Sequence, residues 1–222
     1  EVKMRYKSYI FTMTLFLLCA AAALSQTVRT VTVITEPNAA VWIDEIRRGT
    51  TDESGKLTIK PVAPGVRKMR VRADGFKETT QNLTAAQKGD VKIALVKTAD
   101  EGELLFQQAE KMTLQDREKA VALYEKAAKL RPNRAEIYLG LARVLADRGK
   151  LDEALEAIKR ARRVRPLYAE ASAVEGRIYK DAGEEEAAVA SFRRAIREGK
   201  GVQPEAYTGL GLLYKDKAGG AG

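Results

Sequence analysis

The side chains that most enzymes use for nucleophilic or metal chemistry are scarce in this sequence. It holds no histidine, and its one cysteine, Cys19, lies inside an apolar run near the N-terminus. These two facts exclude Ser-His-Asp and Cys-His catalysis, zinc sites with histidine ligands and an intramolecular disulfide. No pair of carboxylates has a spacing that indicates acid–base work. We therefore expect a protein that has no catalytic activity and no bound cofactor or metal.

A stripe of cations is the first feature with the chemistry of a binding site. Lys68, Arg70 and Arg72 alternate with other residues, so in a strand they project from one face at intervals of about 7 Å. Such a stripe suits the phosphate or carboxylate groups of an anionic polymer or of lipid headgroups. The alternative is that these cations cover an edge strand and prevent it from pairing with another chain. Aromatic residues are only 6% of the chain, so stacked bases and hence nucleic acid are not expected.

The first 25 residues have the three parts of an export signal. A short basic segment, residues 4–7, precedes an almost uncharged apolar run at residues 10–24. Ala23 and Ser25 are small residues at positions −3 and −1 of a cleavage site. We expect residues 1–25 to be a signal peptide, which places the protein in the periplasm or cell envelope. The alternative is an inner-membrane anchor made by residues 10–24.

Residues 26–98 have the pattern of a small β-domain. Turns that contain glycine or proline separate short alternating segments, and this pattern favours an antiparallel β-sandwich. The predicted strands lie at residues 30–33, 41–43, 57–59, 69–73 and 91–95.

Four short motifs in this region resemble the PEGA domain, a compact β-sandwich of bacterial envelope and surface proteins. They are Pro37 to Asp44, Gly49 to Thr51, Pro64-Gly65 and Val71 to Phe76. The resemblance implies a module without catalytic activity that makes envelope contacts or acts as a spacer.

Residues 99–217 repeat with a period of 34. The residues that stand at this interval are Ala120, Ala154 and Ala188; Ala127, Ala161 and Ala195; Tyr124, Ile158 and Phe192; Gly149 and Gly183; and Pro132 and Pro166. Small residues at fixed positions with this period resemble the tetratricopeptide repeat, in which each unit is a pair of antiparallel helices. We expect three units and one closing helix at about residues 205–217, followed by a flexible tail at residues 218–222.

Small residues in these repeats predict where two helices cross closely. Ala142 is expected to pack against Ala154, and Gly176 against Ala188. Ser172 stands where a bulky residue is usual, which weakens the core of the third repeat.

The closing helix carries residues in phase with the earlier repeats after a one-residue insertion. These residues are Tyr207, Gly211 and Tyr214. An exposed apolar surface on this helix would indicate a contact with a partner or with a second copy, whereas a cap buried on the third repeat is the alternative.

The tetratricopeptide resemblance also implies a concave groove, lined by the first helix of each repeat, that binds a protein or an acidic peptide segment. Carried onto this sequence, the predicted partner-binding residues are Leu139, Arg143, Arg177, Lys180, Leu212 and Lys215. The two arginines and two lysines would form a basic wall that holds carboxylates. The alternative is that these arginines pair with Glu170, Asp147 and Asp181 along the groove and only solubilise it.

These patterns together predict an exported scaffold or adaptor of the cell envelope with two domains. The helical array would bind a protein partner, and the β-domain would contact the envelope or act as a spacer. Two alternatives stay open: a structural wall-associated protein that binds anionic polymer through its basic strand, and an accessory subunit of an envelope enzyme.

Overall fold

The computed structural model describes residues 28–219. These residues form two compact units, of which the first contains residues 28–72 and 78–95 and the second contains residues 73–77 and 96–219. The predicted export signal lies outside the described residues, and so do the last three residues of the predicted tail. Among the described residues, no helix combines the length and the hydropathy that a membrane span requires.

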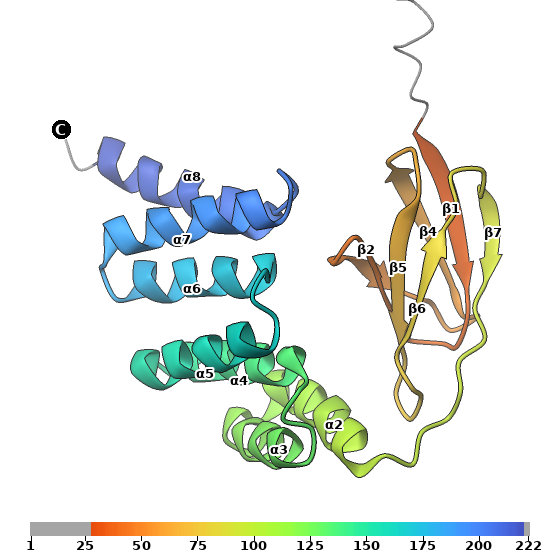
Figure 1. The fold of residues 1–222 in the computed structure, drawn as a ribbon, viewed down its shortest axis with the longest axis horizontal. Helices are drawn as coiled ribbons and strands as arrows, with labels where there is room; N and C mark the ends of the chain where they lie inside the picture. The colour runs from red at the N-terminus through yellow and green to blue at the C-terminus, as the bar shows by residue number, and fades with distance from the viewer. Residues whose placement is uncertain (1–27, 220–222) are drawn as a thin grey trace, which may run out of the picture. The chain divides into compact units, whose positions relative to one another are not determined.

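The first unit is rich in β-structure and contains two sheets. The smaller sheet has the strand order β4-β1-β7, and the larger has the order β3-β2-β5-β6. The strands are β1 Arg29–Ile34, β2 Ala40–Ile43, β3 Ile46–Thr50, β4 Lys56–Val62, β5 Arg67–Arg72, β6 Thr79–Leu83 and β7 Gly89–Lys92 (Figure 1).

Alternation along the strands decides which side chains are buried. Val31 and Val33 of β1 have no exposed surface, because residues two apart lie on the same face of a strand. In β2 both faces are covered, and Val41, Trp42 and Ile43 are all buried. The two sheets meet where β3 contacts β4. There, a Cβ placed on Gly49 would lie 3.2 Å from a methyl group of Leu57, so the glycine lets the two strands approach.

The prediction of a wholly antiparallel unit is wrong for one pair of strands. β1 and β7 run parallel, with Val31 opposite Gly89 and Ile34 opposite Lys92. β7 follows the last strand of the other sheet, so the chain reaches β1 by a crossover and not by a hairpin, and a crossover permits the parallel direction.

The position of β5 excludes one interpretation of the basic stripe. β5 lies between β2 and β6, so Lys68, Arg70 and Arg72 do not cover an edge strand. The edges of this sheet are β3 and β6, two strands that the sequence pattern did not predict.

The second unit is a stack of helices (Figure 1). They are α2 Glu101–Gln115, α3 Arg117–Leu130, α4 Ala135–Asp147, α5 Leu151–Val164, α6 Ala169–Asp181, α7 Glu185–Glu198 and α8 Pro204–Gly219. α2, α4 and α6 begin 34 residues apart, as do α3, α5 and α7. α8 begins 35 residues after α6, which agrees with the predicted insertion. The period of the sequence is therefore the period of the structure.

Contacts between the helices define an inner surface of the array. Each second helix, α3, α5 or α7, contacts the first helix of its own repeat and the helix that follows it. The first helices also contact one another, from α2 to α4, α6 and α8, whereas no contact joins α3, α5 and α7 in the described part of the chain. The first helices therefore lie closer to one another than the second helices do, so the array curves with the first helices on its concave side. We call the surface formed by α2, α4, α6 and α8 the inner surface.

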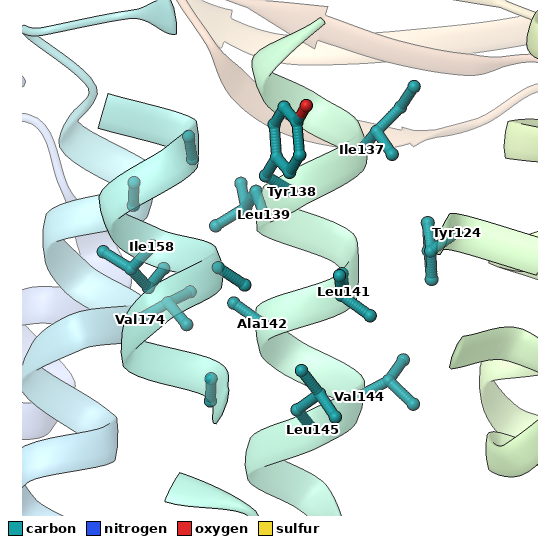
Figure 2. Packing of buried hydrophobic residues seen from close by; sticks show 14 of the residues in the cluster. Tyr124, Ile137, Tyr138, Leu139, Leu141, Ala142, Val144, Leu145, Ile158 and Val174 are labelled. Atoms are coloured by element: carbon teal, nitrogen blue, oxygen red, sulfur yellow. The ribbon is translucent and has the colours of Figure 1, made fainter. Parts of the chain in front are cut away.

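Large and small side chains match where each second helix meets the next repeat. A Cβ on Gly140 would lie 2.5 Å from the ring of Tyr124, and one on Gly209 would lie 2.2 Å from the ring of Phe192. At the middle interface, Ile158 and Val174 are both fully buried. Figure 2 shows Tyr124 on one side of α4, and Ile158 with Val174 on the other. An aromatic residue therefore faces a glycine, and a branched aliphatic residue faces valine.

One expectation about small residues needs correction, and the glycines of α8 differ in their surroundings. The three atoms nearest to a Cβ on Gly176 all belong to the ring of Phe192, so Phe192 and not Ala188 is its closest neighbour. In α8 the glycine that packs on the array is Gly209, whereas Gly211 has no atom within 4 Å of its Cβ position. Gly211 keeps the phase of Gly176, but no helix among the described residues covers it.

Candidate functional site

Charged residues recur on the inner surface at the period of the array. Arg143 of α4 and Arg177 of α6 are equivalent residues of successive repeats. Glu136, Glu170 and Glu205 lie in the first turns of α4, α6 and α8, at intervals of 34 and 35. Because equivalent residues lie beside one another in a stack, the carboxylates form one row across this surface and the guanidinium groups form another.

Arg143 joins three of the inner helices. Its Nη2 lies 3.3 Å from Oε1 of Glu170 on α6 and 3.4 Å from Oε2 of Glu205 on α8. Burial lowers the pKa of Arg143, but Glu170 and Glu205 outweigh it, and the net pKa is raised above its ordinary value. Arg143 is therefore a permanent cation, held in position by carboxylates of two other helices.

Arg177 makes a second connection between inner helices. Its Nη1 donates to Oδ1 of Asp147 on α4 at 2.8 Å. Its Nε is buried and makes no hydrogen bond to the described residues. Lys180, one turn further along α6, lies 2.8 Å from Oδ1 of its neighbour Asp181. The pairs of Arg177 with Asp147 and of Arg143 with Glu170 are ones that the alternative interpretation proposed, whereas Asp181 is paired with a lysine and not with an arginine.

The predicted basic wall is thus a surface of mixed charge. Its cations Arg143, Arg177, Lys180 and Lys215 are accompanied by the carboxylates Glu170, Glu205, Asp147 and Asp181. The repeat that places the cations in a row also places the acids in a row. Overall attraction of an acidic partner is therefore small, and recognition on this surface depends on individual contacts.

The predicted apolar contacts divide into one buried and one exposed residue. Leu139 is only 3% exposed and belongs to the hydrophobic core, so its assignment as a partner-binding residue is wrong. In Figure 2 it lies on the side of α4 where Ile158 and Val174 are, within the same apolar cluster. Leu212 of α8 is 46% exposed, and Lys215 is also exposed.

Tyr168, just before α6, is a residue that the sequence patterns did not single out. It is 2% exposed, and its hydroxyl makes no hydrogen bond to the described residues. The guanidinium carbon of Arg165 lies 4.3 Å from its ring centroid. Burial raises the pKa of Tyr168 well above its ordinary value, and the charges of Glu170 and Glu136 raise it further. The phenol therefore stays protonated beside these two carboxylates.

A polar cluster replaces apolar packing in the third repeat. Ser172 is fully buried, donates to Oε2 of Glu198 at 2.7 Å and accepts from Nε of Arg194 at 3.2 Å. Arg162 of α5 also bonds to Ser172, and its Nη2 lies 3.0 Å from Oε1 of Glu198. Ser172 is equivalent to Tyr138 of the second repeat, and its small side chain leaves the room that the charged groups occupy. The apolar core accordingly divides at α6 into two clusters.

The basic stripe of β5 is engaged within its own unit. The guanidinium carbons of Arg70 and Arg72 lie 4.4 Å and 4.9 Å from the ring centroid of Trp42, and their side chains are 7% and 9% exposed. Arg70 pairs with Glu45 at 3.3 Å, and both arginines lie within 3.8 Å of one oxygen of Glu78. Lys68, at 59%, is the well-exposed member of the three. An anionic polymer would have to displace carboxylates to reach the arginines.

Within the described part of the chain, no group of three histidine, cysteine, aspartate or glutamate residues has the arrangement of a metal site.

Comparison with known families identifies the helical unit. Two family models of the tetratricopeptide repeat match the chain, one at residues 112–178 and the other at residues 169–198. The predicted tetratricopeptide repeats are therefore confirmed. No curated protein matches the sequence.

Solved structures resemble the helical array. The TPR domain of Sgt2 from Aspergillus fumigatus is 22% identical, with a TM-score of 0.50, and the match covers 55% of this chain and 83% of that domain. MamA is 24% identical, with a TM-score of 0.48 and coverage of 54% and 70%. The first TPR domain of Spaghetti (RPAP3), bound to the HSP90 peptide SRMEEVD, is 18% identical, with a TM-score of 0.49 and coverage of 55% and 96%. At these identities the resemblance concerns the fold.

Proposed function

We propose that this chain is an exported scaffold or adaptor of the cell envelope that binds a protein partner on the inner surface of its tetratricopeptide repeats. Arrays of this kind are interaction modules that use an extended concave surface. In this proposal, residues 99–217 hold the partner. Residues 26–98, with their resemblance to the PEGA domain, contact the envelope or act as a spacer, and neither part is catalytic. Export depends on residues 1–25.

The proposal rests on the hydrogen-bond donors of Arg143 and Arg177 that the carboxylates of the chain leave unoccupied. Arg143 forms its ion pairs through Nη2 and Arg177 forms its ion pair through Nη1. The second terminal nitrogen of each residue makes no hydrogen bond to the described residues, and the two side chains are 35% and 32% exposed. Both groups therefore have donors left for a carboxylate of a partner.

The carboxylates that hold these arginines favour binding. Glu170, Glu205 and Asp147 restrict the guanidinium groups before the partner arrives, so less side-chain entropy is lost on association. Because the inner surface carries about as many acids as bases, the partner is selected by where its acidic residues lie. The proposed ligand is a peptide segment with acidic groups spaced to meet Arg143 and Arg177, a terminal carboxylate included.

Binding of an anionic polymer through β5 has less support. Arg70 and Arg72 are stacked on Trp42 and paired with Glu45 and Glu78, as described above.

Cross-linking in cells tests the proposal. Partners are captured from the envelope fraction by the native chain, by the double variant Arg143→Glu/Arg177→Glu, and by the control Arg160→Glu/Arg163→Glu. The control makes the same change of charge at two exposed residues of α5, which does not belong to the inner surface. We expect one protein partner to be captured by the native chain and the control and lost in the inner-surface variant.

A second double variant separates binding from folding. Arg143→Gln/Arg177→Gln removes the charge without placing new acids beside Glu170 and Asp147, and circular dichroism verifies that the helices persist. Capture that survives in a folded Gln variant contradicts the role of the two arginines. Recovery of wall polymer alone, or a chain missing from the envelope fraction, contradicts the adaptor and the export parts of the proposal.

A further inference from the structure

Helix α8 repeats the side chains of α6 on the face that α6 turns toward α7. With the insertion counted, Gly211 is equivalent to Gly176, and Tyr214 is equivalent to Tyr179. The flanking residues Glu170, Lys180 and Asp181 of α6 also have identical counterparts in α8 at a shift of 35. At these positions the two helices present the same side chains, whereas Tyr207 of α8 stands where α6 has Ser172.

On α6 this surface is covered by a helix. Gly176 is buried, and a Cβ at that position would lie 2.6 Å from the ring of Phe192 on α7. Tyr179 packs against the same apolar cluster as Phe192. The glycine is what allows the aromatic ring of α7 to reach the backbone of α6.

On α8 the same surface is uncovered. Gly211 is exposed, with no atom within 4 Å of its Cβ position, and Tyr207 and Tyr214 are 52% and 49% exposed. Within the described residues α8 contacts only α6 and α7, and its apolar packing runs through Ala206, Gly209 and Leu213 on another face. The two tyrosine hydroxyls each make one long hydrogen bond, Tyr207 to the carbonyl of Gly201 at 3.3 Å and Tyr214 from Arg193 of α7 at 3.4 Å, which leaves the faces of both rings open. The stripe of Tyr207, Gly211 and Tyr214 is thus half of a helix-pair interface. We call it the α8 stripe.

The three covered repeats specify what fits such a half-interface. In each, the covering helix has a large residue preceded by alanine four positions earlier and followed by alanine three positions later. The three sets are Ala120, Tyr124 and Ala127; Ala154, Ile158 and Ala161; and Ala188, Phe192 and Ala195. All of these residues are buried.

We propose that the α8 stripe is a second binding site, which takes an α-helix of another polypeptide with this small–large–small spacing. The helix packs on α8 as α7 packs on α6, and its large residue, aromatic as in α7, lies over Gly211. The interface continues the series that joins α2 to α3, α4 to α5 and α6 to α7. This site is separate from the inner-surface cations, since Arg143 and Arg177 take no part in it.

The test uses the full chain and a labelled peptide with the sequence of residues 184–200, which contains the α7 pattern. Fluorescence anisotropy measures its binding to the native chain and to the variant Gly211→Ala. Alanine suits a helix better than glycine and meets no atom of the chain at this position, so the melting temperature should not fall. In the complex its methyl group would collide with the incoming ring, as a Cβ on Gly176 would collide with Phe192.

We expect the peptide to bind the native chain and to lose about tenfold or more of its affinity for Gly211→Ala. A peptide carrying Phe192→Ala should bind as weakly, and Arg143→Gln in the chain should have no effect. Three results would overturn the proposal. The first is that the peptide fails to bind. The second is that it binds equally to Gly211→Ala, as it would by displacing the chain's own α7. The third is that sedimentation shows the chain alone to dimerise in a manner abolished by Gly211→Ala, because the stripe would then bind a second copy and not a different polypeptide.

Discussion

The pairing of large and small residues between repeats makes a quantitative prediction. Tyr124 faces Gly140 at one interface, whereas Ile158 and Val174 are fully buried at the equivalent one (Figure 2). We predict that Tyr124→Ile and Gly140→Val, which together copy the second pair into the first interface, are each destabilising alone and largely compensate each other when combined.

The structure gives the size of each effect. A Cβ on Gly140 would lie 2.5 Å from the Tyr124 ring, about 1 Å closer than an ordinary carbon contact, and such overpacking costs about 1–3 kcal/mol. The better helix propensity of valine returns about 0.5 kcal/mol. Tyr124→Ile removes a buried ring and its 3.4 Å contact with Thr113, at a cost of about 2 kcal/mol.

Thermal unfolding followed by the helical circular dichroism signal measures the outcome. The two single costs add to about 2.5–4.5 kcal/mol, whereas the double variant should lose only about 1 kcal/mol, because isoleucine leaves room for valine. At about 2–4 °C per kcal/mol, additivity predicts a fall of about 5–18 °C and compensation predicts about 2–4 °C.

The control is Gly211→Val, which changes a helical glycine with no neighbour within 4 Å and so measures helix propensity alone. If the double variant equals the sum of the singles to within about 0.5 kcal/mol, the matched interface is refuted. The two positions would then act independently in spite of their proximity.

Two further predictions concern other parts of the chain. Asp52 accepts hydrogen bonds from the backbone of Lys56 and from Ser54, and these bonds lower its pKa below the ordinary 3.8. The bonds therefore stabilise the turn above about pH 4, and this stabilisation is lost as the pH falls through the lowered pKa. Urea unfolding followed by Trp42 fluorescence should show a lower midpoint for Asp52→Ala than for the native chain at pH 7 and equal midpoints well below that pKa; a difference that persists in acid would contradict this account. Glu198→Ala leaves Arg162 and Ser172 without their buried carboxylate and should lower the free energy of unfolding by about 2–3 kcal/mol. Hydrogen exchange should show protection lost in α6 and α7 and kept in α2 and α3, whereas a uniform loss would contradict a local role.

The strands show how far a sequence pattern reaches. The segment around Val31 was predicted because one face of its strand is buried, which makes apolar residues alternate, and the segment around Val41 was predicted because it is a short apolar run, which is buried on both faces. β3 and β6 were missed because they are edge strands with mostly polar residues, so neither carries an apolar alternation. Their place in the sheet comes from pairing with β2 and β5, which no local pattern records.

The helices show the opposite case. The positions of seven helices in the described chain follow from the 34-residue period, because every repeat must bury the same faces against its neighbours. The same period predicts the row that contains Arg143 and Arg177, and it also relates the acids Glu136, Glu170 and Glu205 to one another.

What no sequence pattern supplied is which charges meet. Arg143 reaches Glu205, 62 residues further along the chain, because the curvature of the array brings the beginning of α8 toward α4. The α8 stripe is likewise visible in the sequence as a repeat of α6, but only the stacked structure shows that no described helix covers it. Residue types and spacing determine which faces a repeat presents. Whether a face ends up paired, buried or exposed depends on how many repeats stack and how they curve, and those are properties of the whole fold.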